Sequence, residues 1–341
     1  MSAGSLSSIS TALPARSAHS SIAFAGVCAL VIASAGLLSG MAPLGFSIAI
    51  VFLFAGPHNW LELRYFMTQM PARWGPLRAY FIVGIGGVLA LTVGFIAIPI
   101  VARHWQLSYD TIGHLSSAWL SAVALWVAWL LHLRSKQHPA RDFWWAWPIA
   151  LLIVAGVWYR AWAFEIALVY LHPMIALAFC HNVIRRKRPQ WLGAYRAALA
   201  LSAVVLGLIW WRLWDAPALP GDDMLSMRIT ANAGAEWLTA ISSHALVASH
   251  TFLELLHYGV WVVLIPLVTM QAMPWKLSNI PLARRGGAFR LGVVMVCALG
   301  IVVVIALWAG FIANYPLTRD LYFMLAIAHV LAEAPFLIRT L

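Results

Sequence analysis

Charged residues are scarce in this chain, and their scarcity excludes an ordinary soluble domain. Only 10% of the 341 residues are charged, with 11 acidic residues against 22 Lys and Arg, whereas 63% are hydrophobic. The apolar runs are longer than the core of a soluble protein requires. No segment outside these runs is long enough to bury a core of its own. The sequence therefore predicts a polytopic membrane protein with one membrane domain.

Cysteine is also scarce, and this excludes two kinds of site. The three cysteines, Cys28, Cys180 and Cys297, lie within apolar runs and have no paired spacing. A disulfide framework is therefore excluded, and so is a set of thiolate ligands for zinc or an iron–sulfur cluster. The formal net charge of +11 would suggest a nucleic-acid partner in a soluble protein. Here the cations fall mostly in alternate loops, where they set membrane topology, so we expect no nucleic-acid partner.

Ten apolar windows are long enough to be membrane helices, which predicts an all-α polytopic bundle of about ten transmembrane helices. The windows are 22–40, 44–66, 79–102, 114–134, 143–160, 162–184, 193–213, 242–269, 290–313 and 319–339. Residues 1–20, rich in Ser and Ala, are expected to be a disordered tail, and residues 21–341 a single transmembrane domain. The segment between the seventh and eighth windows is expected to be an external loop or short lid.

The basic residues predict the orientation of these helices. If the N-terminus is cytoplasmic, 17 of the 22 Lys and Arg residues fall on the cytoplasmic side. Such a bias over short loops follows the positive-inside rule and requires an even number of helices. We therefore expect both termini to be cytoplasmic and the protein to be integral to the inner (plasma) membrane.

Ionisable residues at membrane depth are costly and usually mark function, and the first such pair is His58 and Glu62. These residues are four apart, so they share one face of the second predicted helix. Pro57 immediately precedes His58 and interrupts the backbone hydrogen bonds of that turn. We interpret His58 as a metal ligand and Glu62 as a catalytic carboxylate.

The sixth predicted helix holds two further histidines, His172 and His181. Their separation of nine residues corresponds to about 2.5 helical turns, so the two histidines lie on opposite faces unless Pro173 bends the helix. The Cys-His-Asn context slightly favours His181, whereas His172 lies deeper in its helix. Both remain candidate metal ligands.

The last two groups lie on the eighth and tenth predicted helices. His250, Glu254 and His257 occupy positions i, i+4 and i+7, which form one stripe of a helix. His329 and Glu333 repeat the four-residue spacing of His58 and Glu62. The expected depths differ, because His250 falls in the outer half of its window and His329 near the middle. Convergence therefore requires a shift of about one turn, or roughly 5 Å, in a helix boundary.

The residue types indicate the chemistry of a common site. Imidazole-rich sites with open coordination positions suit iron, which can bind dioxygen. The glutamates Glu62, Glu254 and Glu333 would orient imidazole rings or carry protons. A site among apolar helices suits a lipid substrate that arrives sideways from the bilayer. We therefore expect non-haem Fe(II), dioxygen and an apolar small-molecule substrate.

Three short patches resemble a known family. Residues 57–62, Pro-His-Asn-Trp-Leu-Glu, resemble the Pro-His-Gly-x-Leu-Asp element of the bacteriorhodopsin-related-protein family of membrane β-carotene dioxygenases. Residues 328–333 are similar to its final Pro-His-x-x-x-x-Asp element, and residues 257–259, His-Tyr-Gly, to its His-Phe-Gly. The resemblance implies a carotenoid substrate, with His58 and His329 as iron ligands and His257 as a plausible third. His181 and His250 would complete the set by analogy of order.

Three other functions remain open on sequence alone. A haem-binding electron-transfer protein would use two histidines from separate helices, but it would leave the three glutamates unexplained. A proton-coupled transporter would use buried His and Glu as a relay, although we find no inverted repeat. A membrane di-iron hydroxylase typically has clusters such as His-x-x-His-His, and this chain has none.

Overall fold

The computed structural model describes residues 13–69, 75–137, 141–269 and 276–340, and these residues contain helices but no strand. The α-helices are α1 Leu13–Met41, α2 Pro43–Gln69, α3 Arg78–His104, α4 Tyr109–Gln137, α5 Ala146–Tyr159, α6 Ala161–Lys187, α7 Leu192–Leu213, α8 Met224–Asn232, α9 Ser243–Gly259, α10 Ile265–Thr269, α11 Gly287–Ala313 and α12 Tyr315–Ile338. A π-helical turn, Val260–Leu264, joins α9 to α10, and short 3₁₀ turns lie at Pro189–Trp191, Leu277–Asn279 and Ala283–Arg285.

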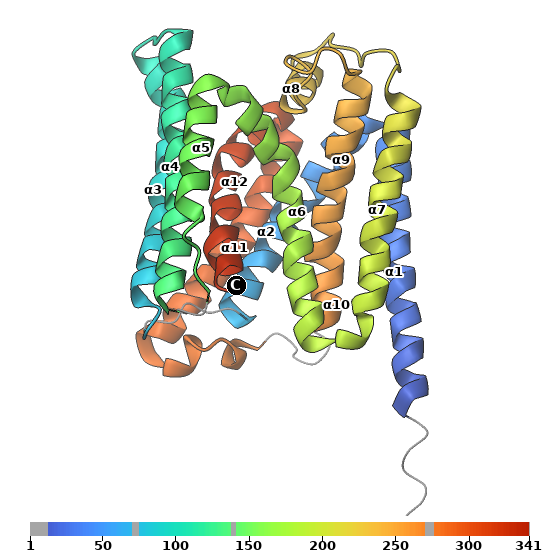
Figure 1. The fold of residues 1–341 in the computed structure, drawn as a ribbon, viewed down its shortest axis with the longest axis vertical. Coiled ribbons are helices and arrows are strands. Elements are labelled where there is room, and N and C mark those ends of the chain that lie inside the picture. The colour runs from blue at the N-terminus through green and yellow to red at the C-terminus, as the bar shows by residue number, and fades with distance from the viewer. Residues whose placement is uncertain (1–12, 70–74, 138–140, 270–275, 341) are drawn as a thin grey trace, which may run out of the picture.

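The predicted all-α polytopic membrane bundle is confirmed. Within the described residues, nine helical segments are long and apolar enough to cross a membrane, and α9, the π turn and α10 together form one of them. The remaining predicted window corresponds to α5, whose 14 residues span only about 21 Å, less than the ~30 Å of a bilayer core. The end of α12 and the start of α1 lie toward the same end of the bundle (Figure 1).

The N-terminal boundary differs from the expected one. Helix α1 begins at Leu13, so the last residues of the expected disordered tail, 13–20, are helical. Residues 1–12 of that expected tail lie outside the described residues. Apolar residues become frequent only from Ile22 onward, and this set the expected start of the first helix. The helix begins earlier, because the Ala and Ser residues that precede Ile22 are compatible with helical structure.

Helix α9 is the central helix of the bundle. In the apolar stretch of the segment that contains α9, 67% of the residues are buried. In every other described segment long enough to cross a membrane, the corresponding fraction is at most 39%. It packs against α1, α2, α6 and α7, and the neighbouring helices surround it in Figure 1. A polar side chain on α9 therefore faces protein rather than lipid on most sides.

An aromatic cluster closes the bundle interior toward the end that holds the chain termini. Trp261 of the π turn lies with its ring centroid 5.7 Å from Tyr65, 5.8 Å from Phe66 and 5.7 Å from Phe179. The pairs with Tyr65 and Phe66 are edge-to-face, an arrangement that is favourable at these distances. The four buried rings fill the interior on the side opposite α8.

The expected external segment contains a short helix, α8, at the opposite end of the bundle (Figure 1). The Asp223 carboxylate caps α8 by accepting from the backbone N–H groups of Leu225 and Ser226, at 2.8 and 2.9 Å. Arg228 of α8 pairs with Asp320 of α12. We refer to this end, which carries α8, as the outer end.

Candidate metal centre

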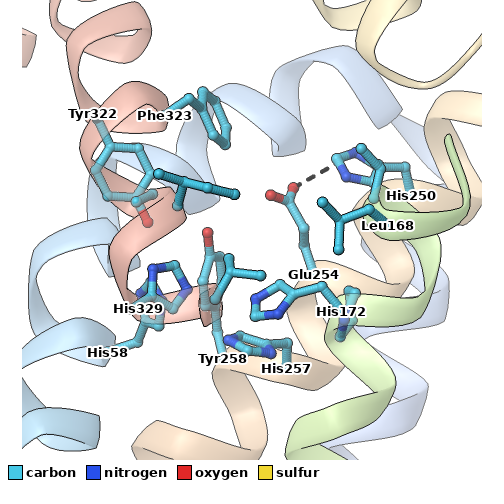
Figure 2. Close-up of a pocket in the computed structure, with 15 residues that line it drawn as sticks. His58, Leu168, His172, His250, Glu254, His257, Tyr258, Tyr322, Phe323 and His329 are labelled. Carbon is cyan, nitrogen blue, oxygen red and sulfur yellow. Dashed lines mark ion pairs between the residues drawn. The ribbon is translucent and has the colours of Figure 1, made fainter. Parts of the chain in front are cut away.

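Four histidines from four different helices meet inside the bundle (Figure 2). They are His58 of α2, His172 of α6, His257 of α9 and His329 of α12. The ring centroid of His58 lies 5.4 Å from that of His257 and 5.2 Å from that of His329. The centroid of His172 lies 4.7 Å from His257 and 5.2 Å from His329. We call these four residues the histidine cluster.

Three members of the cluster have the geometry of a metal site. One ring nitrogen of each of His58, His257 and His329 lies within 4.8 Å of the corresponding nitrogen of the other two. The side chains of His58 and His257 are buried and that of His329 is half-buried. Nitrogen ligands bind first-row metals at about 2.0–2.1 Å. A single ion can therefore contact all three rings after small side-chain movements.

The four histidines also lie at similar depth. Each is 11 to 15 residues from the outer end of its helix, or roughly 16–23 Å along the helix axis. The expected spread in depth is therefore not found among these four residues. The convergence is possible because α2, α6, α9 and α12 all begin near the outer end, so equal numbers of residues bring their side chains to one level.

The local structure of α2 fixes the orientation of His58. Its Nδ1 atom lies 2.8 Å from the backbone carbonyl oxygen of Phe54 and donates to it. The preceding Pro57 has no N–H to contribute to this turn. With Nδ1 protonated, Nε2 carries the lone pair, and this atom is buried without a hydrogen-bond partner among the described residues. The tautomer of His58 thus presents Nε2 as a ligand.

His257 lacks partners even more completely. It is 2% exposed, and neither of its ring nitrogens makes a hydrogen bond of ordinary geometry to a described residue. A buried polar atom without a partner costs about 1–3 kcal/mol. Coordination of a metal by His257 and His58 would satisfy both residues. The donor set therefore fits a metal ion.

Glu333 lies beside the fourth histidine, His172. Its Oε2 atom lies 3.3 Å from Nδ1 of His172, and its Oε1 atom accepts from the indole N–H of Trp261 at 3.2 Å. Carboxylates that hold the second nitrogen of a histidine are a common supporting shell around metal sites. Trp261 lies in the π turn, and such turns are frequent at functional sites. Glu333 thereby links α6, α12 and the continuation of α9.

Glu62 lies one turn beyond His58, and its surroundings differ from those of Glu333. It is 1% exposed, and neither carboxylate oxygen has a hydrogen-bond partner among the described residues. It is close enough to Glu333 for the two carboxyl groups to interact electrostatically. Glu62 and Glu333 therefore form a buried acidic pair, one turn from His58 and His329 on the side away from α8.

A cavity of about 180 Å³ adjoins the histidine cluster toward the outer end. Its polar corner is formed by Glu254 and His250, whose Oε2 and Nδ1 atoms are 3.9 Å apart (Figure 2). Most of its remaining wall is apolar and includes Leu168 of α6 and Phe323 of α12. An engineered apolar cavity of about 150 Å³ holds a benzene molecule. The cavity beside the cluster therefore accommodates a small apolar group.

Two of the predicted metal ligands do not join the cluster. His250 lines the adjoining cavity, but it is not among the residues whose nitrogens converge. The interpretation of His181 as a ligand is not supported, because His181 lines a separate cavity between α6, α7 and α9. The structure brings His172, the less favoured of the two, into the cluster and leaves His181 outside it. The spacing of about 2.5 turns does place these two histidines on opposite faces of α6.

The predicted carboxylates all lie in the same region but not in one layer. Glu254 lines the cavity on the outer side of the cluster, whereas Glu62 and Glu333 lie on the other side.

Sequence reasoning missed Tyr258 and Tyr322, which line the cavity with their hydroxyl groups directed inward (Figure 2). Helical spacing could have found both, since Tyr258 follows Glu254 by four residues and Tyr322 precedes His329 by seven.

The chain was compared with known protein families, curated proteins and solved structures. No family model matches the chain, and no curated protein or solved structure is significantly similar to it.

Proposed function

We propose that this protein is a metal-dependent membrane oxidoreductase, in which a non-haem Fe(II) ion and dioxygen oxidise an apolar lipid. The observation that carries the proposal is the convergence of three ring nitrogens, from His58, His257 and His329, within 4.8 Å of one another. The three residues are distant in the sequence, and a chance meeting of buried imidazoles inside a membrane bundle would be costly.

The donor set favours iron among the metals of oxidation chemistry. Imidazole suits zinc, copper, nickel and iron, whereas only some of these ions also activate dioxygen. Bound Fe(II) would supply electrons to dioxygen. The chain itself would contribute the ligands His58, His257 and His329, the orientation of His172 by Glu333, and a cavity from which Trp261 and its aromatic neighbours exclude water.

The surroundings of the cluster favour an apolar substrate such as a carotenoid. The cavity lies between membrane-spanning helices, and its wall is largely apolar. A hydrophobic molecule dissolved in the bilayer could reach such a site without crossing water. The positive-inside distribution of Lys and Arg supports cytoplasmic termini, and we propose the inner (plasma) membrane as the location.

The family resemblance supports the same proposal from a different direction. It implied His58 and His329 as ligands and His257 as a third, and these are the residues whose nitrogens converge. The haem alternative has weaker support, because one haem takes two axial histidines, whereas four histidine rings meet in this cluster.

Elemental analysis of the detergent-purified protein tests the proposal. We expect iron in the native chain, no Soret band in its absorption spectrum, and loss of iron in His58→Ala, His257→Ala and His329→Ala. The matched control is His181→Ala, which removes a histidine of α6 that lies in a separate cavity. This variant should retain its iron. Equal iron content in the three cluster variants and the control would reject the site.

Nitric oxide provides a second measurement that does not depend on the substrate. It binds ferrous iron at an open coordination position and gives a characteristic electron paramagnetic resonance signal. A protein that contains iron but shows no such signal would lack the open position that the proposed reaction needs.

A further inference from the structure

Glu254 is a buried acceptor that faces the cavity beside the histidine cluster. It is 9% exposed, and its Oε2 atom has no hydrogen-bond partner among the described residues. The nearest basic group is His250, whose Nδ1 atom is 3.9 Å from Oε2. Hydrogen bonds between nitrogen and oxygen are about 2.7–3.2 Å long, so His250 does not satisfy this oxygen.

The other walls of the cavity do not supply a donor to this oxygen. The neighbours on α6 and α12 include Leu168, Phe323 and Ile327, which are apolar. The Tyr322 hydroxyl, on the far side of the cavity, lies 3.4 Å from Nδ2 of Asn59 and accepts from it (Figure 2). One corner of an otherwise largely apolar cavity therefore holds a carboxylate oxygen that is not hydrogen-bonded.

A buried acceptor without a partner is unfavourable by about 1–3 kcal/mol, more when it is charged, unless a ligand brings the donor. We propose that Glu254 binds the hydroxyl group of the substrate, and that the substrate is therefore a hydroxyl-bearing apolar lipid rather than a pure hydrocarbon. This inference rests on the proposed function, because it takes the cavity as the place where the substrate reacts.

The geometry also bears on which part of the lipid reacts. Glu254 precedes His257 by three residues on the same helix, a rise of about 4.5 Å. Both residues line the same small cavity. A hydroxyl group held by Glu254 thus places the adjoining carbon atoms of the lipid next to the histidine cluster. Oxidation would occur close to the polar end of the molecule and not at the middle of a long chain.

Photoaffinity labelling tests this inference without relying on catalysis. The probes are a long-chain alcohol with a diazirine near its hydroxyl end, and the alkane and the ketone of the same chain with the diazirine at the same position. Each is incorporated into nanodiscs with the native protein, Glu254→Leu or Glu254→Gln. Labelled peptides from α9 and α12 are then quantified by mass spectrometry, and the iron content of every preparation is measured.

We expect the alcohol to label the cavity of the native protein about tenfold more than the alkane, since a hydrogen bond to a charged group contributes roughly 1.5–3 kcal/mol. This preference should disappear in Glu254→Leu and weaken in Glu254→Gln. The matched control, Glu165→Gln, changes an exposed glutamate of α6 and should keep the preference.

Three results would overturn the inference. These are equal labelling by alcohol and alkane in the native chain, an unchanged preference in Glu254→Leu, and a preference for the ketone, which would make the carboxyl group a donor. The iron measurement separates this inference from the proposed function. A native protein without iron would refute the proposed oxidoreductase, whereas the labelling result would still test whether Glu254 binds a hydroxyl group.

Discussion

Replacement of Glu333 by leucine should destabilise the metal-free protein strongly. Glu333 is completely buried, with an exposed fraction of 0%. Its two oxygens contact different helices, through the Trp261 indole N–H at 3.2 Å and through Nδ1 of His172 at 3.3 Å. Leucine occupies a similar volume but can accept neither contact. The substitution would therefore leave the Trp261 indole N–H without its partner and remove the acidic neighbour of His172 inside the bundle.

The size of the effect follows from these two contacts. The hydrogen bond from the Trp261 indole N–H to a charged group contributes roughly 1.5–3 kcal/mol, and the 3.3 Å contact with His172 adds the attraction of a buried ion pair when the imidazole is protonated. Removal of one partner from a buried ion pair costs about 3–5 kcal/mol in other proteins. We therefore expect Glu333→Leu to lower the free energy of unfolding by about 3–5 kcal/mol.

The three cysteines of the chain provide the assay, because all of them are buried and free. Protein stripped of metal with a chelator is unfolded in mixed micelles by increasing amounts of sodium dodecyl sulfate. A maleimide dye that fluoresces on reaction with thiols then reports exposure of Cys28, Cys180 and Cys297. The midpoint and slope of the transition give the free energy of unfolding.

Glu62→Leu is the matched comparison, because Glu62 is equally buried but neither of its oxygens has a hydrogen-bond partner among the described residues. Replacement of a buried polar group that has no partner by a hydrophobic residue of similar volume removes a desolvation cost of about 1–3 kcal/mol. We expect the metal-free Glu62→Leu variant to be at least as stable as the native chain. If both variants lose the same stability, the reasoning from individual contacts is refuted.

Two further predictions concern regions away from the cluster. The same unfolding assay applies to two neighbouring glycines of α3. Alanine at Gly87 should destabilise the protein by about 1–3 kcal/mol, because its Cβ atom would lie 2.0 Å from the indole nitrogen of Trp126. Alanine at Gly86, which has open space around it, should be neutral or stabilise the protein by up to about 1 kcal/mol. Hydrogen bonds from Ser226 hold the pKa of Asp223 below its ordinary value of 3.8, so the cap of α8 should persist at all pH values above 3.8 and be lost as the pH falls through the lower folded-state pKa. Hydrogen exchange of the α8 amides at a series of pH values, with Asp223→Ala as the control, would measure this; protection that already fails near neutral pH would contradict it.

The helices were predictable because the bilayer leaves a chain few alternatives. Backbone groups cannot hydrogen-bond to lipid, so an apolar window of spanning length must form a helix. Each of the ten predicted windows is helical in the structure. The exact ends were less predictable. The fifth window, 143–160, becomes the 14-residue α5, because residues 143–145 precede its first turn.

The candidate ligands were predictable where the signal lies within one helix. The four-residue spacing of His58 with Glu62, and of His329 with Glu333, follows from the helical repeat and identified two cluster members. The choice between His172 and His181 depends on how α6 is rotated relative to α9 and α12, which the sequence of α6 does not contain. Trp261 reaches Glu333 from a π turn, and no apolar pattern indicates such a turn.

The interior of this bundle is more polar than stability alone would favour. Among the described residues, buried side-chain atoms without hydrogen-bond partners occur on every helix of the histidine cluster, and they include atoms of His58, His257 and Glu254. Each such atom destabilises the folded state by about 1–3 kcal/mol. Their sum is a large part of the free energy of unfolding, which is typically about 5–15 kcal/mol. Leucine at the same positions would pack without this loss. Under the two proposals made above, a metal ion would satisfy His58 and His257, and a polar lipid group would satisfy Glu254.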